Sequence, residues 1–213
     1  MMAALSKDEM MTMDKMSAMR NASKNQVIYF PEDASNAIYM LKEGKVKISK
    51  QSGDGKEIIL AFLHPGEVFG ELSITGQEKR EEIAEATEDA VVCVVDVKDL
   101  QMMMEKNPKF NFNITKLIGF KLKKIQSRFE SLIFKSSEER VSSFIKELAV
   151  EHGKPILGNP EEKLIQLKLT HEDIAKLTAT SRQTVTSTLN LLEKKNIIMY
   201  DRRSIFVKQL SKL

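Results

Sequence analysis

THEDIAKLTATSRQTVTSTLNLLEKKNII, residues 170–198, is the stretch that decides the fold of the C-terminal third of this chain. Thr170 and Asp173 have the spacing of a capping box, which predicts a helix over HEDIAKLT. ATATS follows as a short turn, and Ser181 is a favourable N-cap for a second helix. The pattern therefore predicts two helices joined by a tight turn.

The second helix has an apolar side and a polar side. Its predicted inward residues are Val185, Leu189, Leu192 and Ile197. After it, NIIMY and SIFVKQ alternate on either side of a DRR turn, which predicts a β-hairpin. Two helices, a tight turn and a hairpin make a winged helix-turn-helix, whose second helix enters the major groove of DNA.

Short hydrogen-bonding side chains dominate the outer side of that helix, as a surface that reads base edges requires. A purely structural helix would favour Glu, Lys and Ala over hydroxyl residues. Arg182 suits guanine and Gln183 suits adenine. The predicted base-reading residues are Arg182, Gln183, Thr186 and Ser187. Ser181, Thr184 and the first amides of the helix suit phosphate.

Charge is distributed unevenly along the 213 residues. From residue 164 to the end there are nine Lys or Arg and four Asp or Glu, a net +5, so the first 163 residues carry −2 of the total +3. A basic C-terminal module indicates a polyanionic partner, although a charge run alone is often only a solvated face.

Residues 26–97 have the texture of short strands separated by turns. VIYF and KVKISK alternate apolar with polar residues, and glycines stand where hairpins should close. Regularly spaced short strands predict an antiparallel sandwich or barrel such as a jelly roll. Cys93, inside AVVCVVDV, is predicted to be a small buried strand residue.

The spacing of apolar residues changes from strand-like alternation to helix-like steps between about residues 108 and 136. An apolar seam runs along this segment at steps of four, three, four and three: Ile118, Leu122, Ile125, Phe129 and Leu132. Such a narrow seam favours a helix that pairs with a second copy of the chain, and the alternative is a helix packed on its own sheets. Ser136 and Ser137 then form a hinge and N-cap, and EERVSSFIKELAVEHG predicts another helix ending at Gly153.

Several functional classes are disfavoured. One cysteine and three scattered histidines provide neither a disulfide framework nor a metal site, so no cofactor is expected. No nucleophile–base pair, paired-carboxylate motif or phosphate loop indicates an enzyme. The Met-rich N-terminus is interrupted by charges, which predicts an amphipathic helix on the body rather than a signal peptide, and the protein is expected to be cytoplasmic without a membrane span.

The chain resembles the cyclic-AMP receptor protein/FNR family of bacterial transcription regulators over nearly its whole length. The residues that carry the resemblance are LKEGKVKI, SGDGKEIIL, HPGEVFGEL, the seam helix and HEDIAKLTATSRQTVTSTLNLLEKKNII. It implies an α+β protein with a β-jelly-roll effector domain (1–107), a dimerisation helix (108–136) and a winged helix-turn-helix (137–213). The implied partners are double-stranded DNA, a second copy of the chain and RNA polymerase, which the family often contacts through the loop that here reads KPILGNPEEK.

The family's reading triplet of Arg, Glu and Arg aligns with Arg182, Gln183 and Ser187. One position is kept and two are changed, which predicts a related but altered pseudo-palindromic operator. Thr170 and Arg203 align with family phosphate contacts.

The family's cyclic-AMP pocket is matched only in part, by Gly70, Glu71, Leu72 and Arg80. The serine that follows the family's arginine is Glu81 here, and a carboxylate beside a phosphate costs about 1–4 kcal/mol at 4 Å. The adenine-contacting pair aligns with Ile125 and Gln126. Arg80 either binds a phosphate or pairs with Glu81, Glu82 or Glu85.

Two functions therefore remain open for this domain. The first is a regulator with an unidentified small-molecule effector or none, and the second is a regulator that binds cyclic AMP through Glu71 and Arg80. A nucleotide-binding module without DNA binding, of the kind attached to kinases and channels, would not continue into a winged helix. An iron–sulfur cluster is not expected, because such a cluster needs several cysteines and the chain has one.

Overall fold

The computed structural model describes residues 11, 17–55, 57–156, 158–166, 169–201 and 204–213. The chain divides into two compact units, one within residues 2–124 and the other within residues 125–213. Arg203 and most of the predicted Met-rich N-terminal helix (residues 1–10 and 12–16) lie outside the described residues.

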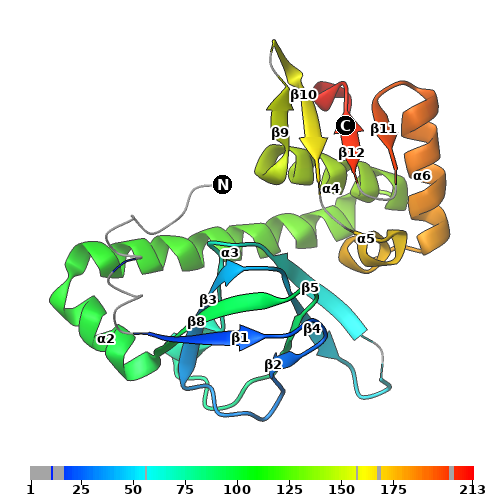
Figure 1. The fold of residues 1–213 in the computed structure, drawn as a ribbon. Coiled ribbons are helices and arrows are strands. Elements are labelled where there is room, and N and C mark those ends of the chain that lie inside the picture. Colours follow the sequence, from blue (N-terminus) through cyan, green and yellow to red (C-terminus); the bar gives the residue numbers. More distant parts are fainter. Residues whose placement is uncertain (1–10, 12–16, 56, 157, 167–168, 202–203) are drawn as a thin grey trace. The chain divides into compact units, whose positions relative to one another are not determined.

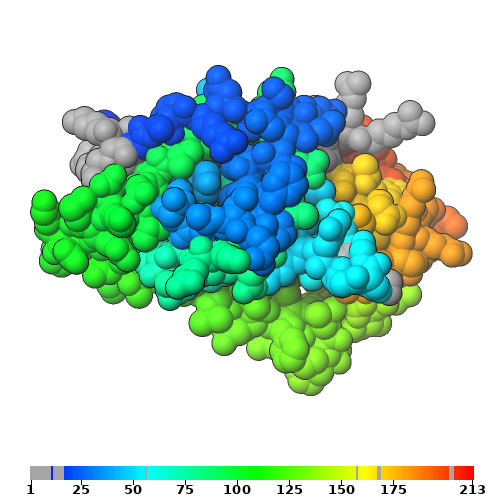
Figure 2. Space-filling model, turned by 90° about the horizontal axis from the view of Figure 1, so that it is seen from below, coloured from blue at the N-terminus to red at the C-terminus, as the bar shows by residue number. Residues whose placement is uncertain are grey.

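Two antiparallel four-stranded sheets build the first unit (Figure 1). One sheet has the strand order β1 (Ala18–Ala22), β8 (Ala90–Asp96), β3 (Ala37–Glu43) and β6 (Val68–Phe69). The other has the order β2 (Val27–Tyr29), β7 (Ile83–Ala86), β4 (Val46–Gln51) and β5 (Glu57–Leu63). The predicted jelly-roll architecture is confirmed, as two jelly-roll-like sheets rather than a closed barrel. Strand β1 includes Ala18, Met19 and Arg20, the end of the Met-rich stretch that was expected to be a helix, and the expectation is wrong for these three residues because they pair with β8. The strand is exposed over its first four residues and contributes to the blue surface in Figure 2.

Strand β3 is buried on both faces, which explains its continuous apolar run. Tyr39 and Leu41 belong to the core between the two sheets, together with residues of β4 and β7. Ile38 and Met40, on the opposite face, pack with α2 (Val97–Lys106) and the start of α3 (Pro108–Phe134). Period-2 alternation sends successive side chains to opposite faces, so one strand contributes to two cores. Cys93 is buried in the second of these cores, as predicted.

Helix α3 is continuous over 27 residues, and only its beginning is fully buried. Phe110 and Ile114 are its buried residues, and Leu117 and Ile118 pack against the same core while remaining partly exposed. Beyond them the helix carries exposed apolar side chains.

A three-helix core covered by a small sheet forms the second unit. Its elements are α4 (Ser137–His152), β9 (Lys154–Ile156), β10 (Asn159–Ile165), α5 (His171–Thr178), α6 (Arg182–Lys194), β11 (Ile198–Tyr200), β12 (Ile205–Val207) and the 3-10 helix η2 (Leu210–Lys212). The sheet order is β11-β12-β10-β9 (Figure 1). Ile145, Ile174, Val185 and Val207 are among the side chains that close the core.

Residues 154–163 are not the loop that the sequence predicted. Lys154–Ile156 and Asn159–Ile165 pair as antiparallel strands, and Gly158, with φ of +96°, lies between them. Leu164 and Ile165 also pair with β12, so β10 lies between β9 and β12 in the sheet. Pairing with neighbouring strands outweighs the weak β-propensity of KPI and NPEEK.

Candidate functional site

Local capping fixes the α5–turn–α6 unit. The Thr170 hydroxyl accepts a hydrogen bond from the Asp173 amide, and the Asp173 carboxylate accepts one from the Thr170 amide, which confirms the predicted capping box. Ala179 closes the helix in a left-handed conformation, with φ of +50°. Ser181 accepts a hydrogen bond from the Thr184 amide at 3.0 Å and caps α6, as predicted.

The two sides of α6 differ as the sequence predicted. Val185, Leu189 and Leu192 are buried in the core of the second unit, and Ile197 is buried just beyond the helix. Arg182, Gln183 and Ser187 are exposed, and Thr186 is partly buried. The helix therefore presents a polar surface near its N-terminus while its apolar side holds it to the domain.

Several hydroxyl groups of this polar surface are bound within the helix. Thr186 donates to the carbonyl oxygen of Arg182 and Ser187 donates to that of Thr184, both at 3.0 Å. The hydroxyls of Ser181 and Thr184 lie 2.9 Å apart. Thr170 Oγ1 lies 2.8 Å from the Asp173 carboxylate. Hydroxyls that bond their own backbone have less capacity left for a partner.

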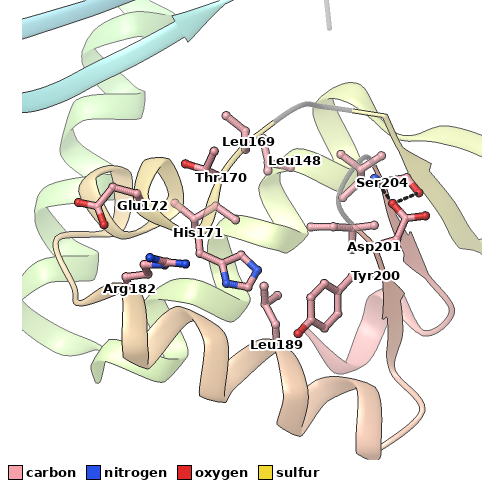
Figure 3. Close-up of a pocket in the computed structure, with 13 residues that line it drawn as sticks. Leu148, Leu169, Thr170, His171, Glu172, Arg182, Leu189, Tyr200, Asp201 and Ser204 are labelled. Atoms are coloured by element: carbon pink, nitrogen blue, oxygen red, sulfur yellow. Dashed lines mark hydrogen bonds between the residues drawn. The ribbon is translucent and has the colours of Figure 1, made fainter.

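A groove of about 810 Å³ lies beside the N-terminus of α6 (Figure 3). Thr170, His171, Arg182, Tyr200 and Ser204 are among its lining residues, so it joins the helix pair to the β11–β12 hairpin. The hairpin turn is tied by the Ser204 amide, which donates to Asp201 Oδ1 at 2.8 Å.

His171 and Tyr200 are site residues that the sequence analysis missed. His171 Nδ1 lies 2.8 Å from Thr186 Oγ1, and its ring centroid is 5.9 Å from that of Tyr200. The Tyr200 hydroxyl donates to Asn190 Oδ1 at 2.7 Å. Burial, and then the charge of Arg182, lower the pKa of His171. The position of His171 directly after the N-cap was the one signal in the sequence, but its partners come from other elements.

Five of the predicted effector residues, Gly70, Glu71, Leu72, Arg80 and Glu81, belong to the first unit, and Arg80 is fully buried there. Arg80 is 1% exposed, and its guanidinium donates to the carbonyl oxygens of Gly70, at 3.0 Å, and Ala37. It also lies over the ring of Tyr29, 4.6 Å from the centroid, and 5.6 Å from that of Tyr39. Burial and the nearby Glu82 carboxylate raise the pKa of Tyr29 well above its usual range.

The carboxylates near Arg80 have other partners, which corrects one of the two expectations for this residue. Glu81 binds Lys50 at 2.6 Å, an interaction that lowers the pKa of Glu81. Glu85 binds Lys47 at 2.9 Å. The buried Glu82 accepts a hydrogen bond from the Tyr29 hydroxyl at 3.3 Å. Arg80 therefore bonds to backbone carbonyls rather than joining an ion cluster with these three glutamates.

Glu71 and Leu72 open the 3-10 helix η1 (Glu71–Thr75) that follows Gly70. The Glu71 carboxylate binds Lys121 of α3 at 2.7 Å, and Lys121 also donates to the carbonyl oxygen of Val68 at 2.7 Å. Ile125 and Gln126, the remaining predicted effector residues, are exposed and belong to the other compact unit.

The predicted apolar seam of α3 is mostly uncovered in the single chain. Ile118 packs against the first unit's core, whereas the exposed fractions of Leu122, Ile125, Phe129 and Leu132 are 55%, 64%, 64% and 50%.

Two other classes of feature are absent from the described residues. No described helix has the length and apolarity that crossing a bilayer requires. Within the same residues, no group of three or more His, Cys, Asp or Glu side chains is placed to bind a metal.

Comparison with known proteins agrees with this two-part organisation. Residues 19–107 match the family described as cyclic nucleotide-binding domain, and residues 139–213 match the Crp-like helix-turn-helix domain. The chain is 26% identical over 198 residues to the anaerobic regulatory protein of Bacillus subtilis, covering 92% of this chain and 82% of that protein. It is 25% identical over 186 residues to the cyclic AMP receptor protein of Thermus thermophilus, covering 87% and 82%.

Solved structures show the same fold. FixK2 from Bradyrhizobium japonicum superposes with a TM-score of 0.80 at 22% identity, over 92% of this chain and 94% of that one. A CooA mutant from Carboxydothermus hydrogenoformans gives a TM-score of 0.79 at 27% identity, over 94% and 88%. The chain is thus a member of the CRP/FNR family of transcription regulators, with a cyclic nucleotide-binding domain followed by a Crp-like helix-turn-helix domain.

Proposed function

We propose that the protein binds DNA as a homodimer, with α6 of each copy in the major groove of a pseudo-palindromic operator. The observation that carries the proposal is the exposed N-terminal face of α6, where Arg182 and Gln183 stand above a buried Val185 and Leu189. A helix in this arrangement brings its first residues to base edges. Two copies related by a two-fold axis read half-sites about one helical turn apart.

The seam of α3 supports the dimer. Four of its five residues are at least half exposed although all are large and apolar. A contiguous exposed apolar surface on a protein is typical of an interaction site, and the four-three spacing is that of a two-helix seam.

A pair of charge-matched variants tests the dimer. Ile125→Glu with Phe129→Glu places two carboxylates in the seam and changes the net charge by −2, whereas Lys123→Glu makes the same change of charge outside the seam. We expect the double variant to sediment as a monomer and to bind operator DNA at least about a hundredfold more weakly. Lys123→Glu should stay dimeric. A wild-type chain that sediments as a monomer at micromolar concentration would overturn the dimer.

The operator is expected to retain a guanine read by Arg182 and to differ at the position of Ser187. Serine is too short to replace the family's second arginine at that position. Selection of binding sites from random duplexes, followed by sequencing, tests this expectation. Recovery of the unmodified cyclic-AMP-receptor half-site would contradict it.

For the first unit, we infer control by a small molecule other than cyclic AMP, or by none. The guanidinium of Arg80 already donates to Gly70 and Ala37, and Glu71 already binds Lys121. A cyclic nucleotide would have to compete with these contacts of Arg80 and Glu71. Its phosphate would also be repelled by the nearby Glu81 carboxylate.

Titration calorimetry with cyclic AMP separates this inference from its alternative, in which Glu71 and Arg80 bind the nucleotide. We expect no heat of binding at micromolar nucleotide. Micromolar affinity that is lost in Arg80→Gln would establish the cyclic-AMP-responsive regulator instead. We also propose that the DNA-bound protein contacts RNA polymerase, the remaining partner expected from the family resemblance.

A further inference from the structure

Thr186 stands among the exposed polar side chains of α6, yet its hydroxyl has two partners within the domain. Oγ1 lies 3.0 Å from the carbonyl oxygen of Arg182 and 2.8 Å from Nδ1 of His171. A carbonyl only accepts, so the hydroxyl proton is directed to Arg182. The second hydrogen bond then requires that His171 carry a proton on Nδ1 and donate it to Oγ1.

His171 is held in place to make this donation. Its ring lies against Tyr200, and the Tyr200 hydroxyl donates to Asn190 on the same helix as Thr186. Both His171 and Tyr200 line the groove beside Arg182 (Figure 3). The lowered pKa of His171 keeps the ring neutral at neutral pH, and a neutral ring has one N–H, which this arrangement places on Nδ1.

The group that Thr186 retains for a partner is its methyl. We propose that Thr186 reads a thymine through methyl–methyl contact rather than through its hydroxyl, and that His171 is the positioning residue that holds the hydroxyl inward. The 5-methyl of thymine lies in the major groove, and threonine methyls are among its contacts in protein–DNA complexes. This inference rests on the proposed function, because it requires that α6 enter the major groove.

Deoxyuridine provides the test, because it pairs as thymine does but lacks the 5-methyl. Each thymine of the selected operator is replaced in turn, and the ratio of affinities for the thymine and uridine duplexes is measured for each protein. The wild-type protein should bind about threefold to fivefold more weakly when the thymine at one position in each half-site is replaced by deoxyuridine. This ratio, called the uridine penalty below, corresponds to the free energy of burying one methyl group. Using a ratio within each protein removes differences in overall affinity or folded fraction.

Two variants distinguish the methyl from the hydroxyl. Thr186→Val keeps a methyl and removes the hydroxyl, so it should retain the uridine penalty at that position. Thr186→Ser keeps the hydroxyl and removes the methyl, so its ratio there should fall to about one. The reverse pattern, with the penalty kept by serine and lost by valine, would overturn the inference.

Two substitutions of His171 test its positioning role. His171→Asn places an amide donor near the position of Nδ1 and should retain the uridine penalty, whereas His171→Leu removes the donor and should reduce it. Equal ratios in the two variants would show that His171 does not act through Thr186. Wild-type protein that binds no duplex would refute the proposed function itself, whereas binding without a uridine penalty would refute this inference alone.

Discussion

Arg80 donates to two backbone carbonyls and is 1% exposed, whereas Arg182 stands exposed in the first turn of α6. The first guanidinium lies over a tyrosine ring and helps to hold the turn at Gly70. The second is supported by a helix whose other side is buried. A buried guanidinium that donates two hydrogen bonds to its own fold contributes to stability, and an exposed one at a helix N-terminus is available to a partner. Stability and DNA binding should therefore separate between these two residues.

The largest effect is expected for Arg80→Ala. It removes a large, fully buried side chain and two hydrogen bonds, so we expect the free energy of unfolding to fall by roughly 2–4 kcal/mol. Arg182→Ala, the matched control, should change it by less than about 0.5 kcal/mol. Denaturant titration followed by circular dichroism measures both changes. Equal losses of unfolding free energy in the two variants would contradict the different roles assigned to the two arginines.

Arg182→Ala should instead act on DNA. Losing one bidentate base contact costs about 1–3 kcal/mol, so we expect binding to the selected operator to weaken about tenfold to a hundredfold. Binding to unrelated duplexes should change much less. Arg20→Ala, on strand β1, removes the same charge from the other unit and should leave operator affinity within about twofold. Gel-shift titrations give these values, and uniform weakening on all sequences would make Arg182 a phosphate contact.

Two buried threonines provide a smaller comparison, between a hydroxyl that is hydrogen-bonded within the fold and one that is not. Thr188 is buried, and its hydroxyl has no hydrogen-bond partner within the described part of the chain, whereas the Thr178 hydroxyl donates to the Ile174 carbonyl at 2.7 Å. Thr188→Val should stabilise the second unit by about 1 kcal/mol because it removes an unpaired polar group. Thr178→Val should be neutral or destabilise it by up to about 1 kcal/mol. Thermal unfolding compares the two, and destabilisation by Thr188→Val would contradict the expectation.

The smallest effect concerns pH. The pKa of His171 is lowered from its ordinary value of 6.5, so the unfolded chain binds this proton more readily than the folded one. The contribution of His171 to stability is thus fully present above pH 6.5 and is lost as the pH falls from 6.5 through the folded pKa. An NMR titration of the imidazole should give a midpoint below 6.5, and His171→Asn should flatten the pH dependence of stability. A midpoint above 6.5 would refute this assignment.

Local signals allowed much of the second unit to be predicted. Capping residues lie three positions from the amides they bind, so Thr170, Asp173 and Ser181 could mark the starts of α5 and α6. The 3.6-residue period likewise identified Val185 and Leu189 as buried. The polar face of α6 follows from the same period.

Partners that come from distant segments could not be predicted in this way. KPI and NPEEK form strands because each pairs with a neighbour, and their own propensities do not indicate it. The partners of Arg80 come from residues 37 and 70, and those of His171 come from α6 and β11. One-dimensional spacing does not specify such contacts.

The sequence by itself determined which side of α6 is polar, where the strands of the first unit alternate and which residues of α3 form an apolar seam, because each depends on a periodicity within one element. Only the tertiary structure decided that the Arg80 guanidinium is bound to its own backbone and that the Thr186 hydroxyl is turned toward His171. Both depend on hydrogen-bond geometry between elements, which forms only after the elements have packed.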